Sequence, residues 1–462
     1  MTINILPDDV LLHIFHFDRV NDLISFLPLA MWRDPGTWHR LVHVCRRWRS
    51  VVFMSPNFLD LRLVCYPWTR LELLGIWPPL PIVIRDAIYT PSREDYDLEA
   101  AIVHRNRVCE IYLIKTTTRL QRLASAMQGQ FPALTHFKLD YFSRDDTSPT
   151  PTLPDDFLVG TAPCLQFLEL QSIAFPALPK FLLSVTDLVY LSLWRIPHSG
   201  YISPEAIVTG LAVLTNLEYL NIEFKSPLSR PYQESRHSPP PTRTVLPALT
   251  SFRFKGVSEY LDGLMARIDA PLLDSIRITF VHQRIFDSPQ LTQFMRRTAR
   301  FQTLNEAHVY FDSTSILVQS SYFVEESWLI IIYQDYSWEP SFLAHVMTSI
   351  FPSFYKVEHL YIHRPRYLLS QWLNDIENLP WPDIFHPFTT VKSLYVCKEF
   401  AQCITLALGE RRMGALPTLG CLFLEEEFPP SEPVQEAIGT LVAARQLLGH
   451  PLAVSPWYRH WQ

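Results

Sequence analysis

The chain has 462 residues, 48% of them hydrophobic, which is enough apolar material for two to four ordinary domains or for one small domain followed by a long repeat array. Its formal net charge of −6 argues against general nucleic-acid binding, which requires a basic stripe. The 7 cysteines form no CxxC pair, so their spacing favours neither a zinc cluster nor a disulfide framework. We expect them to be buried as free thiols, which places the protein in a reducing compartment, the cytoplasm or nucleus.

Two short amphipathic helices are expected in the first 58 residues. The first covers residues 5–17, where Pro7 suits the first helical turn and Asp8 and Asp9 favour its positive end. The second covers residues 38–58. Two helices of this length cannot enclose a core, so the rest of the chain or another protein must cover part of their apolar surface. The apolar stripes consist of Val10, Leu11, Ile14 and Phe15 in the first helix and of Leu41, Val44, Cys45 and Trp48 in the second.

The order of residues in this segment, LP…IF…VCRRW, resembles an F-box over residues 1–58. The connection between the two helices, residues 18–36, is longer than is usual for that motif. The resemblance implies docking onto a Skp-type adaptor and, through it, onto a cullin-RING ubiquitin ligase. A helical cap that packs only on its own chain is the alternative. The residues that the resemblance assigns to adaptor binding are Leu6, Pro7, Val10, Leu11, Ile14, Phe15, Leu41, Val44, Cys45 and Trp48.

Residues 59–107 are expected to form a connecting segment with one or two leading strands, around residues 59–63 and 80–84. After them, one phrase recurs: an apolar residue, two others, an apolar residue, one other, and an apolar residue. Its alternating end predicts a short strand with one buried face. The phrase begins at Val108, Leu134, Leu165, Leu188, Leu217, Leu249, Leu273, Leu304, Val357, Val391 and Leu419.

The segments between these phrases have helical character. In residues 203–214, Ser203 is placed to cap a helix whose first position is Pro204. A strand and a helix that stack many times bury one continuous core. The sequence therefore predicts an α/β fold in which the helical N-terminal segment precedes an irregular solenoid with a curved parallel sheet, over residues 108–430. The pattern resembles leucine-rich repeats of uneven period.

Three segments interrupt or end this pattern. Residues 316–335 contain two β-rich runs and predict an extra hairpin or two extra strands. Residues 226–244 are rich in Pro and polar residues and predict an exposed loop without helix or strand. Residues 431–462 are expected to form a C-terminal capping helix and a tail, with the helix opened by Ser431 and ended by Gly449.

The two patterns together resemble the F-box proteins that are abundant in basidiomycete fungi. This resemblance implies a non-enzymatic substrate-recognition subunit of an SCF-type (Skp-cullin-F-box) ubiquitin ligase, which holds a target protein near a charged E2. We expect no catalytic residue, cofactor, metal, nucleic-acid partner or membrane partner, because the sequence has no phosphate loop, nucleophile elbow, HExxH motif or membrane-length apolar run. A second hypothesis is a non-ligase scaffold whose F-box-like helices pack on its own repeats.

The target-binding face is expected on the strand residues that alternate with the buried ones. Aromatic and Arg side chains recur there, and such side chains dominate interface energetics. The alternative is that loops or packing between repeats cover these rings. Arg253, Lys255 and Arg277 are placed to bind a phosphorylated or acidic segment, unless Asp274 or Glu223 pairs with them. The candidates are Phe167, Tyr190, Trp194, Tyr219, Arg253, Lys255, Arg277, Tyr310, Tyr361 and Tyr395.

Overall fold

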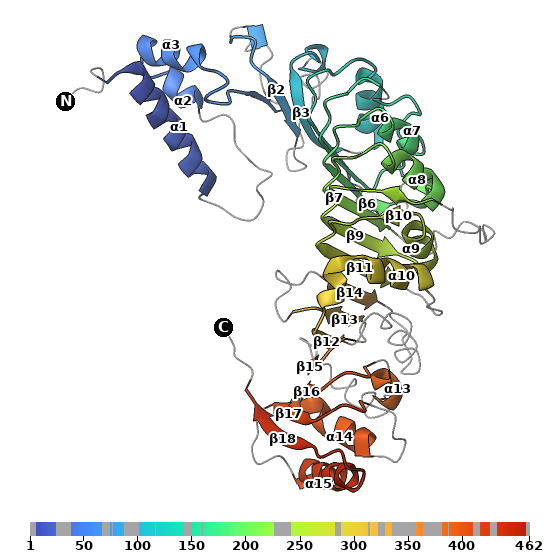
Figure 1. The fold of residues 1–462 in the computed structure, drawn as a ribbon. Helices are drawn as coiled ribbons and strands as arrows, with labels where there is room; N and C mark the ends of the chain where they lie inside the picture. The colour runs from blue at the N-terminus through green and yellow to red at the C-terminus, as the bar shows by residue number, and fades with distance from the viewer. Residues whose placement is uncertain are drawn as a thin grey trace. The chain divides into compact units, whose positions relative to one another are not determined.

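The chain divides into two compact units, Met1–Tyr190 and Leu191–Gln462, and we describe each separately. The boundary falls within the predicted solenoid. Figure 1 shows the fold, which comes from a computed structural model. The structure describes residues 6–24, 38–66, 74–75, 77–86, 101–115, 117–142, 150–158, 160–225, 242–281, 288–312, 315–321, 329–334, 356–363, 381–386, 388–409, 416–425 and 432–458.

The first unit begins with three helices where the sequence predicted two: α1 (Asp8–Ile24), α2 (Trp38–Val42) and α3 (Arg46–Met54). The first predicted helix continues beyond residue 17 because residues 18–24 contain no Gly or Pro that would end it. The prediction of one continuous second helix over residues 38–58 is wrong. Cys45 leaves helical geometry and its Sγ accepts a hydrogen bond from the Trp48 backbone N–H at 3.4 Å, so it starts a new helix as an N-cap.

The remainder of the first unit is a parallel sheet with helices between its strands. The second leading strand predicted in the connecting segment is present as β2. The first, predicted around residues 59–63, overlaps β1 only at Leu63, because residues 59–60 form a turn. Three strands of the repeat follow β2. Strands β1 to β5 are neighbours in chain order and pair in parallel. The elements are β1 (Leu63–Cys65), β2 (Ile82–Asp86), β3 (Val108–Lys115), α6 (Thr117–Ala126), β4 (His136–Tyr141), β5 (Phe167–Gln171) and α7 (Leu178–Leu182).

The second unit opens with four strands of the repeat, and α8, α9 and α10 lie along one face of them (Figure 1). The predicted cap of α8 is confirmed, because Ser203 Oγ accepts a hydrogen bond from the Ala206 N–H at 3.3 Å. Asp262 of α9 caps the next helix by accepting from the Gln290 N–H at 2.7 Å. The elements are β6 (Tyr190–Ile196, whose first residue belongs to the first unit), η2 (His198–Gly200), α8 (Pro204–Leu211), β7 (Tyr219–Phe224), β9 (Ser251–Gly256), α9 (Ser258–Met265), β11 (Ser275–Val281), α10 (Pro289–Arg297) and η3 (Ala299–Thr303).

The predicted loop over residues 226–244 lies outside the described residues up to residue 241. Its last residue is an exception to the prediction, because β8 (Thr244–Val245) pairs in parallel with β10 (Ile268–Asp269) as a small separate sheet. The prediction of no strand is therefore wrong at residue 244, where pairing with a distant segment overrides local composition.

The predicted hairpin is confirmed and is inserted into the sheet. β13 (Ser315–Gln319) pairs antiparallel with β14 (Leu329–Gln334) and with β12 (Glu306–Asp312). The strand order is β11-β14-β13-β12-β15, so the strand after β11 in the sheet is not the next strand in the chain. Parallel pairing resumes with β15 (His359–His363), β16 (Ser393–Val396) and β17 (Cys421–Glu425).

The C-terminal part contains α13 (Trp381–Phe385), η5 (Lys398–Phe400), α14 (Ala401–Gly409) and α15 (Glu432–Leu447). The last of these is the helix predicted to cap the array, and Gly449 follows it with a φ of +78°. The region after it, predicted as a tail, instead adds an edge strand, β18 (Ala453–Trp457), in parallel to β17. Pro456 is tolerated there because an edge strand has one side without a ladder partner.

The core of both units follows the repeat phrase. Its apolar positions are buried on one face of each strand, as in Leu134, Phe137 and Leu139, which are all 0% exposed. The alternating residues lie on the other face, which we call the open face. They are half-buried in β4, β9, β11 and β17, whereas Ser192 and Asn221 are 0% exposed. Among the described helices, none combines the length and apolarity that crossing a bilayer requires.

Candidate functional site

The N-terminal helices pack against one another through the buried side of α1. Leu11 is 0% and Phe15 1% exposed, and the Phe15 ring lies 4.7 Å from that of Trp48. An ion pair of 2.6 Å between Arg47 and Asp8 joins α3 to the start of α1. The position of α1 is therefore fixed by apolar and charged contacts to α3.

Trp38 attaches these helices to the segment that leads into the first sheet. Its indole Nε1 donates a hydrogen bond to the Arg62 carbonyl at 2.9 Å. Its ring meets the rings of Phe53 and Trp77 edge-on, at 5.7 and 5.4 Å. Part of the helical apolar surface is thus covered by the chain itself, as the scaffold hypothesis requires.

Another part of that surface is exposed. Val10, Ile14 and Phe17 are 38%, 42% and 66% exposed, and their i, i+4, i+7 spacing places them on one side of α1. We call these three residues the exposed stripe. Of the ten residues assigned to adaptor binding by resemblance, Leu11 and Phe15 are buried, Leu6, Leu41, Cys45 and Trp48 are half-buried, and Pro7, Val10, Ile14 and Val44 are exposed.

The candidate target-binding residues all lie half-buried on the open face, as their alternation predicted. In the first unit they include Phe167 and Tyr190, whose rings stack at 4.3 Å, while His136 stacks on the other side of Phe167 at 5.6 Å. These rings therefore pack against one another from strand to strand, as the alternative of packing between repeats predicted.

The three cations predicted to lie together are on the open face of the second unit. Arg253 and Lys255 come from β9 and Arg277 from β11, and Arg253 and Arg277 are register partners. The Arg253 guanidinium lies 5.6 Å from the centre of the Tyr219 ring. Burial, followed by the charge of Arg253, lowers the pKa of Arg277. The neighbouring Arg253 therefore disfavours the charged form of Arg277.

Neither carboxylate that was proposed as an alternative partner, Asp274 or Glu223, neutralises these three cations. Asp274 forms an ion pair with Arg300 at 3.2 Å. Burial raises the pKa of Glu223, although Lys255 and both arginines act in the opposite direction. Within the described part of the chain, no ion pair joins Arg253, Lys255 or Arg277 to a carboxylate.

A second group of open-face side chains is aromatic. The rings of His308, Tyr361, Tyr395 and Phe423 stack in a row across neighbouring strands, at 4.3, 4.1 and 4.5 Å between successive rings. Tyr310 stacks on His363 at 4.3 Å. Burial is the first cause that raises the pKa of the Tyr361 phenol above its ordinary value, so this group remains neutral and able to donate.

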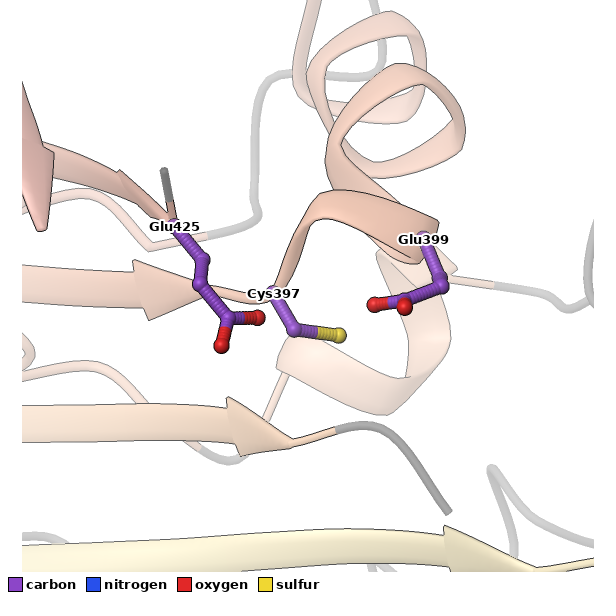
Figure 2. Close-up of side chains that lie close together, drawn as sticks. All are labelled: Cys397, Glu399 and Glu425. Atoms are coloured by element: carbon purple, nitrogen blue, oxygen red, sulfur yellow. The ribbon is translucent and has the colours of Figure 1, made fainter. Parts of the chain in front are cut away.

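Three potential metal ligands meet at the end of β16: Cys397, Glu399 and Glu425, whose ligand atoms all lie within 4.8 Å of one another (Figure 2). Burial, and then the two carboxylates, raise the pKa of the Cys397 thiol well above its ordinary value. A protonated thiol that donates to Glu399 accounts for this geometry. Sequence analysis missed this cluster, because its members come from consecutive repeats and form no motif.

The comparisons with known proteins find a similar solved structure but assign the chain to no family. No protein-family profile matches the chain, and no curated protein matches it. The leucine-rich repeat-containing protein LegL7 from Legionella pneumophila is similar in structure, with 12% sequence identity and a TM-score of 0.28, over 71% of this chain and 97% of that chain. A similarity at this score carries no argument by itself. The strands and helices described above define a mixed α/β repeat protein with a large, mostly parallel sheet, an architecture that serves protein interaction.

Proposed function

We propose that this protein is the substrate-recognition subunit of an SCF-type ubiquitin ligase. Its N-terminal helices dock on a Skp-type adaptor, and through it on the cullin-RING ligase, while the open face of the repeats holds a target protein. The observation that carries the proposal is the exposed stripe of Val10, Ile14 and Phe17 on a helix whose opposite side is buried. Burying apolar surface against a partner is worth roughly 25 cal/mol per Å².

The packing of α1 favours docking because the helix is held in place before a partner arrives. The buried Leu11 and Phe15 hold the helix against α3, and the ion pair between Arg47 and Asp8 holds its first turn. A preformed surface loses little conformational entropy when it binds. The resemblance to F-boxes adds the adaptor as the specific partner.

The proposal assigns no catalysis to this chain. A receptor subunit accelerates ubiquitin transfer by holding the target near a charged E2, which is a proximity effect. We expect this to take place in the cytoplasm or nucleus, where free cysteines persist.

A second candidate function is a non-ligase scaffold, and the buried Trp38 favours it. This side chain, with Phe53 and Trp77, seals part of the helical surface against the chain itself. In a scaffold the exposed stripe would have no dedicated partner, and its substitution would change no association.

Co-purification with a Skp-type adaptor tests the proposal. We expect the wild-type chain to bring down the adaptor, and Val10→Asp/Ile14→Asp to lose it without unfolding, because both side chains are exposed. The matched control is Leu272→Asp/Leu447→Asp, which introduces the same charges at exposed leucines of the second unit. Absence of adaptor from the wild-type sample, or equal loss in both double variants, would favour the scaffold.

A further inference from the structure

Two arginines occupy directly opposing positions on parallel strands of the second unit. Arg253 on β9 pairs in register with Arg277 on β11, and both residues alternate with the buried core residues of their strands. Like charges at opposing positions destabilise a sheet. The sheet retains this unfavourable pair, so an anion that binds between the two guanidinium groups would relieve it.

The immediate surroundings leave the group positively charged. Lys255 follows Arg253 by two residues on the same face, and Glu223 on β7 is its register partner. The charges of Lys255, Arg253 and Arg277 all act on Glu223, and that of Glu223 acts on Arg277. The group therefore combines three cations with this carboxylate. In the part of the chain that the structure describes, these cations form no ion pair.

The shape of the group suits an oxyanion. The Tyr219 ring supports the Arg253 guanidinium at 5.6 Å and so restricts its orientation. Arg253 and Arg277 are half-buried, and their charges are therefore screened less than those on the surface. Two neighbouring guanidinium forks can each form paired hydrogen bonds with one phosphate, and an ammonium adds a point charge.

We propose that Arg253, Arg277 and Lys255 bind a phosphorylated serine or threonine side chain of the target protein. The inference rests on the proposed function, because it takes the open face as the surface that holds the target. A dianionic phosphate matches the excess of two positive charges over Glu223, whereas a single carboxylate neutralises only half of it. A nucleic acid fits less well, because the chain carries a net charge of −6 and the cationic group is bounded by a carboxylate.

The test uses the full chain with its adaptor and two degenerate peptide libraries, which differ only in a fixed central phosphoserine or serine. Binding is measured by fluorescence anisotropy at physiological salt. We expect at least about tenfold tighter binding of the phosphoserine library, from charge-assisted hydrogen bonds. Arg253→Ala/Arg277→Ala should abolish this preference, and Arg253→Lys/Arg277→Lys should weaken it. Glu223→Gln should strengthen it about threefold, because the competing carboxylate is removed.

The matched control is Arg300→Ala/Lys392→Ala. It removes the same two charges from ion pairs with Asp274 and Glu358, elsewhere in the same unit. Three results would overturn the inference: no preference of the wild-type chain for phosphoserine, an equal loss in the control, or equally strong competition by a single-stranded oligonucleotide. Hydrogen exchange on each variant identifies any that unfolds, and the lysine and Glu223→Gln variants then decide the result.

Parallel adaptor pull-downs separate this inference from the proposed function. A wild-type chain that binds the adaptor but shows no preference for phosphoserine refutes only the anion site. Absence of adaptor binding with an intact preference, which Arg253→Ala/Arg277→Ala removes, refutes only the ligase assignment.

Discussion

The hydrogen bond from Trp38 to Arg62 should be the main local attachment of the N-terminal helices to the segment before β1, and Trp38→Phe tests this. The substitution removes the Nε1 donor and leaves the Arg62 carbonyl without it. An orphaned buried acceptor costs about 1–3 kcal/mol. The smaller ring of phenylalanine adds a packing loss of about 1–2 kcal/mol, because Trp38 is 0% exposed and neither water nor neighbouring side chains easily fill the space that its ring leaves.

Trp381→Phe is the matched control for this prediction. Trp381 is also buried, at 1% exposed, but within the described residues its Nε1 has no hydrogen-bond partner. The control therefore loses the same packing volume and breaks no hydrogen bond. The difference between the two variants isolates the bond, and we expect Trp38→Phe to be more destabilising by about 1–3 kcal/mol.

Native-state hydrogen exchange measures both variants, because it reports opening free energies segment by segment and does not require two-state unfolding. Amides of α2 and α3 should exchange faster in Trp38→Phe, while those of β15 and β16 stay unchanged. Equal effects of the two tryptophan substitutions on their own surroundings would refute the reasoning. So would unchanged protection of α2 and α3.

Three further predictions concern single side chains. A hydrogen bond from His308 is the first cause that lowers the pKa of Glu306. The ionised Glu306 therefore stabilises the fold above its unfolded-state pKa, and this contribution is lost as the pH falls through its folded-state pKa. Glu306→Gln should flatten the acid limb of a pH–stability curve. Asp262→Ala should lower the local opening free energy of α10 by about 1 kcal/mol, and so speed its amide exchange, because the Asp262 carboxylate of α9 caps α10. Burial raises the pKa of the Cys65 thiol to about 11, so iodoacetamide at pH 8 should modify exposed Cys164 at least about tenfold faster.

Each of these has a contradicting result. An acid limb that is the same in wild type and Glu306→Gln would show that the carboxylate does not contribute. Equal effects of Asp262→Ala on α9 and α10 would point to general loosening rather than a lost cap. Labelling of Cys65 at the rate of Cys164 would mean that the strand opens freely.

The strands of the repeat could be predicted because burial fixes their pattern. Each phrase from Val108 to Leu419 marks a strand, since the alternating apolar positions must all face the same core. The last strand could not be predicted this way. β18 contains Pro456 and has no repeat phrase, and only its pairing with β17 makes it a strand.

The sequence also did not show that the apolar stripe of α1 divides into an exposed and a buried part. Val10 and Leu11 are adjacent apolar residues, but one is 38% and the other 0% exposed. Periodicity shows that a helix has an apolar side and does not show which part of a broad side meets the core. Cys45 was assigned to the apolar stripe of the second predicted helix, and its role as an N-cap depends on a backbone turn that has no characteristic residue.

The inserted hairpin has a consequence for how the second unit can be shortened. Arrays of repeats tolerate removal of terminal units because each contacts only its nearest neighbours in sequence. Here residues 276–281 pair with residues 329–334, so the neighbour of β11 is supplied from beyond β12 and β13. A fragment that ends after β12 would leave the edge of β11 bare and prone to aggregate. The shortest stable truncation in this region must therefore retain β14, and β11 cannot complete its pairing during synthesis until that strand has emerged.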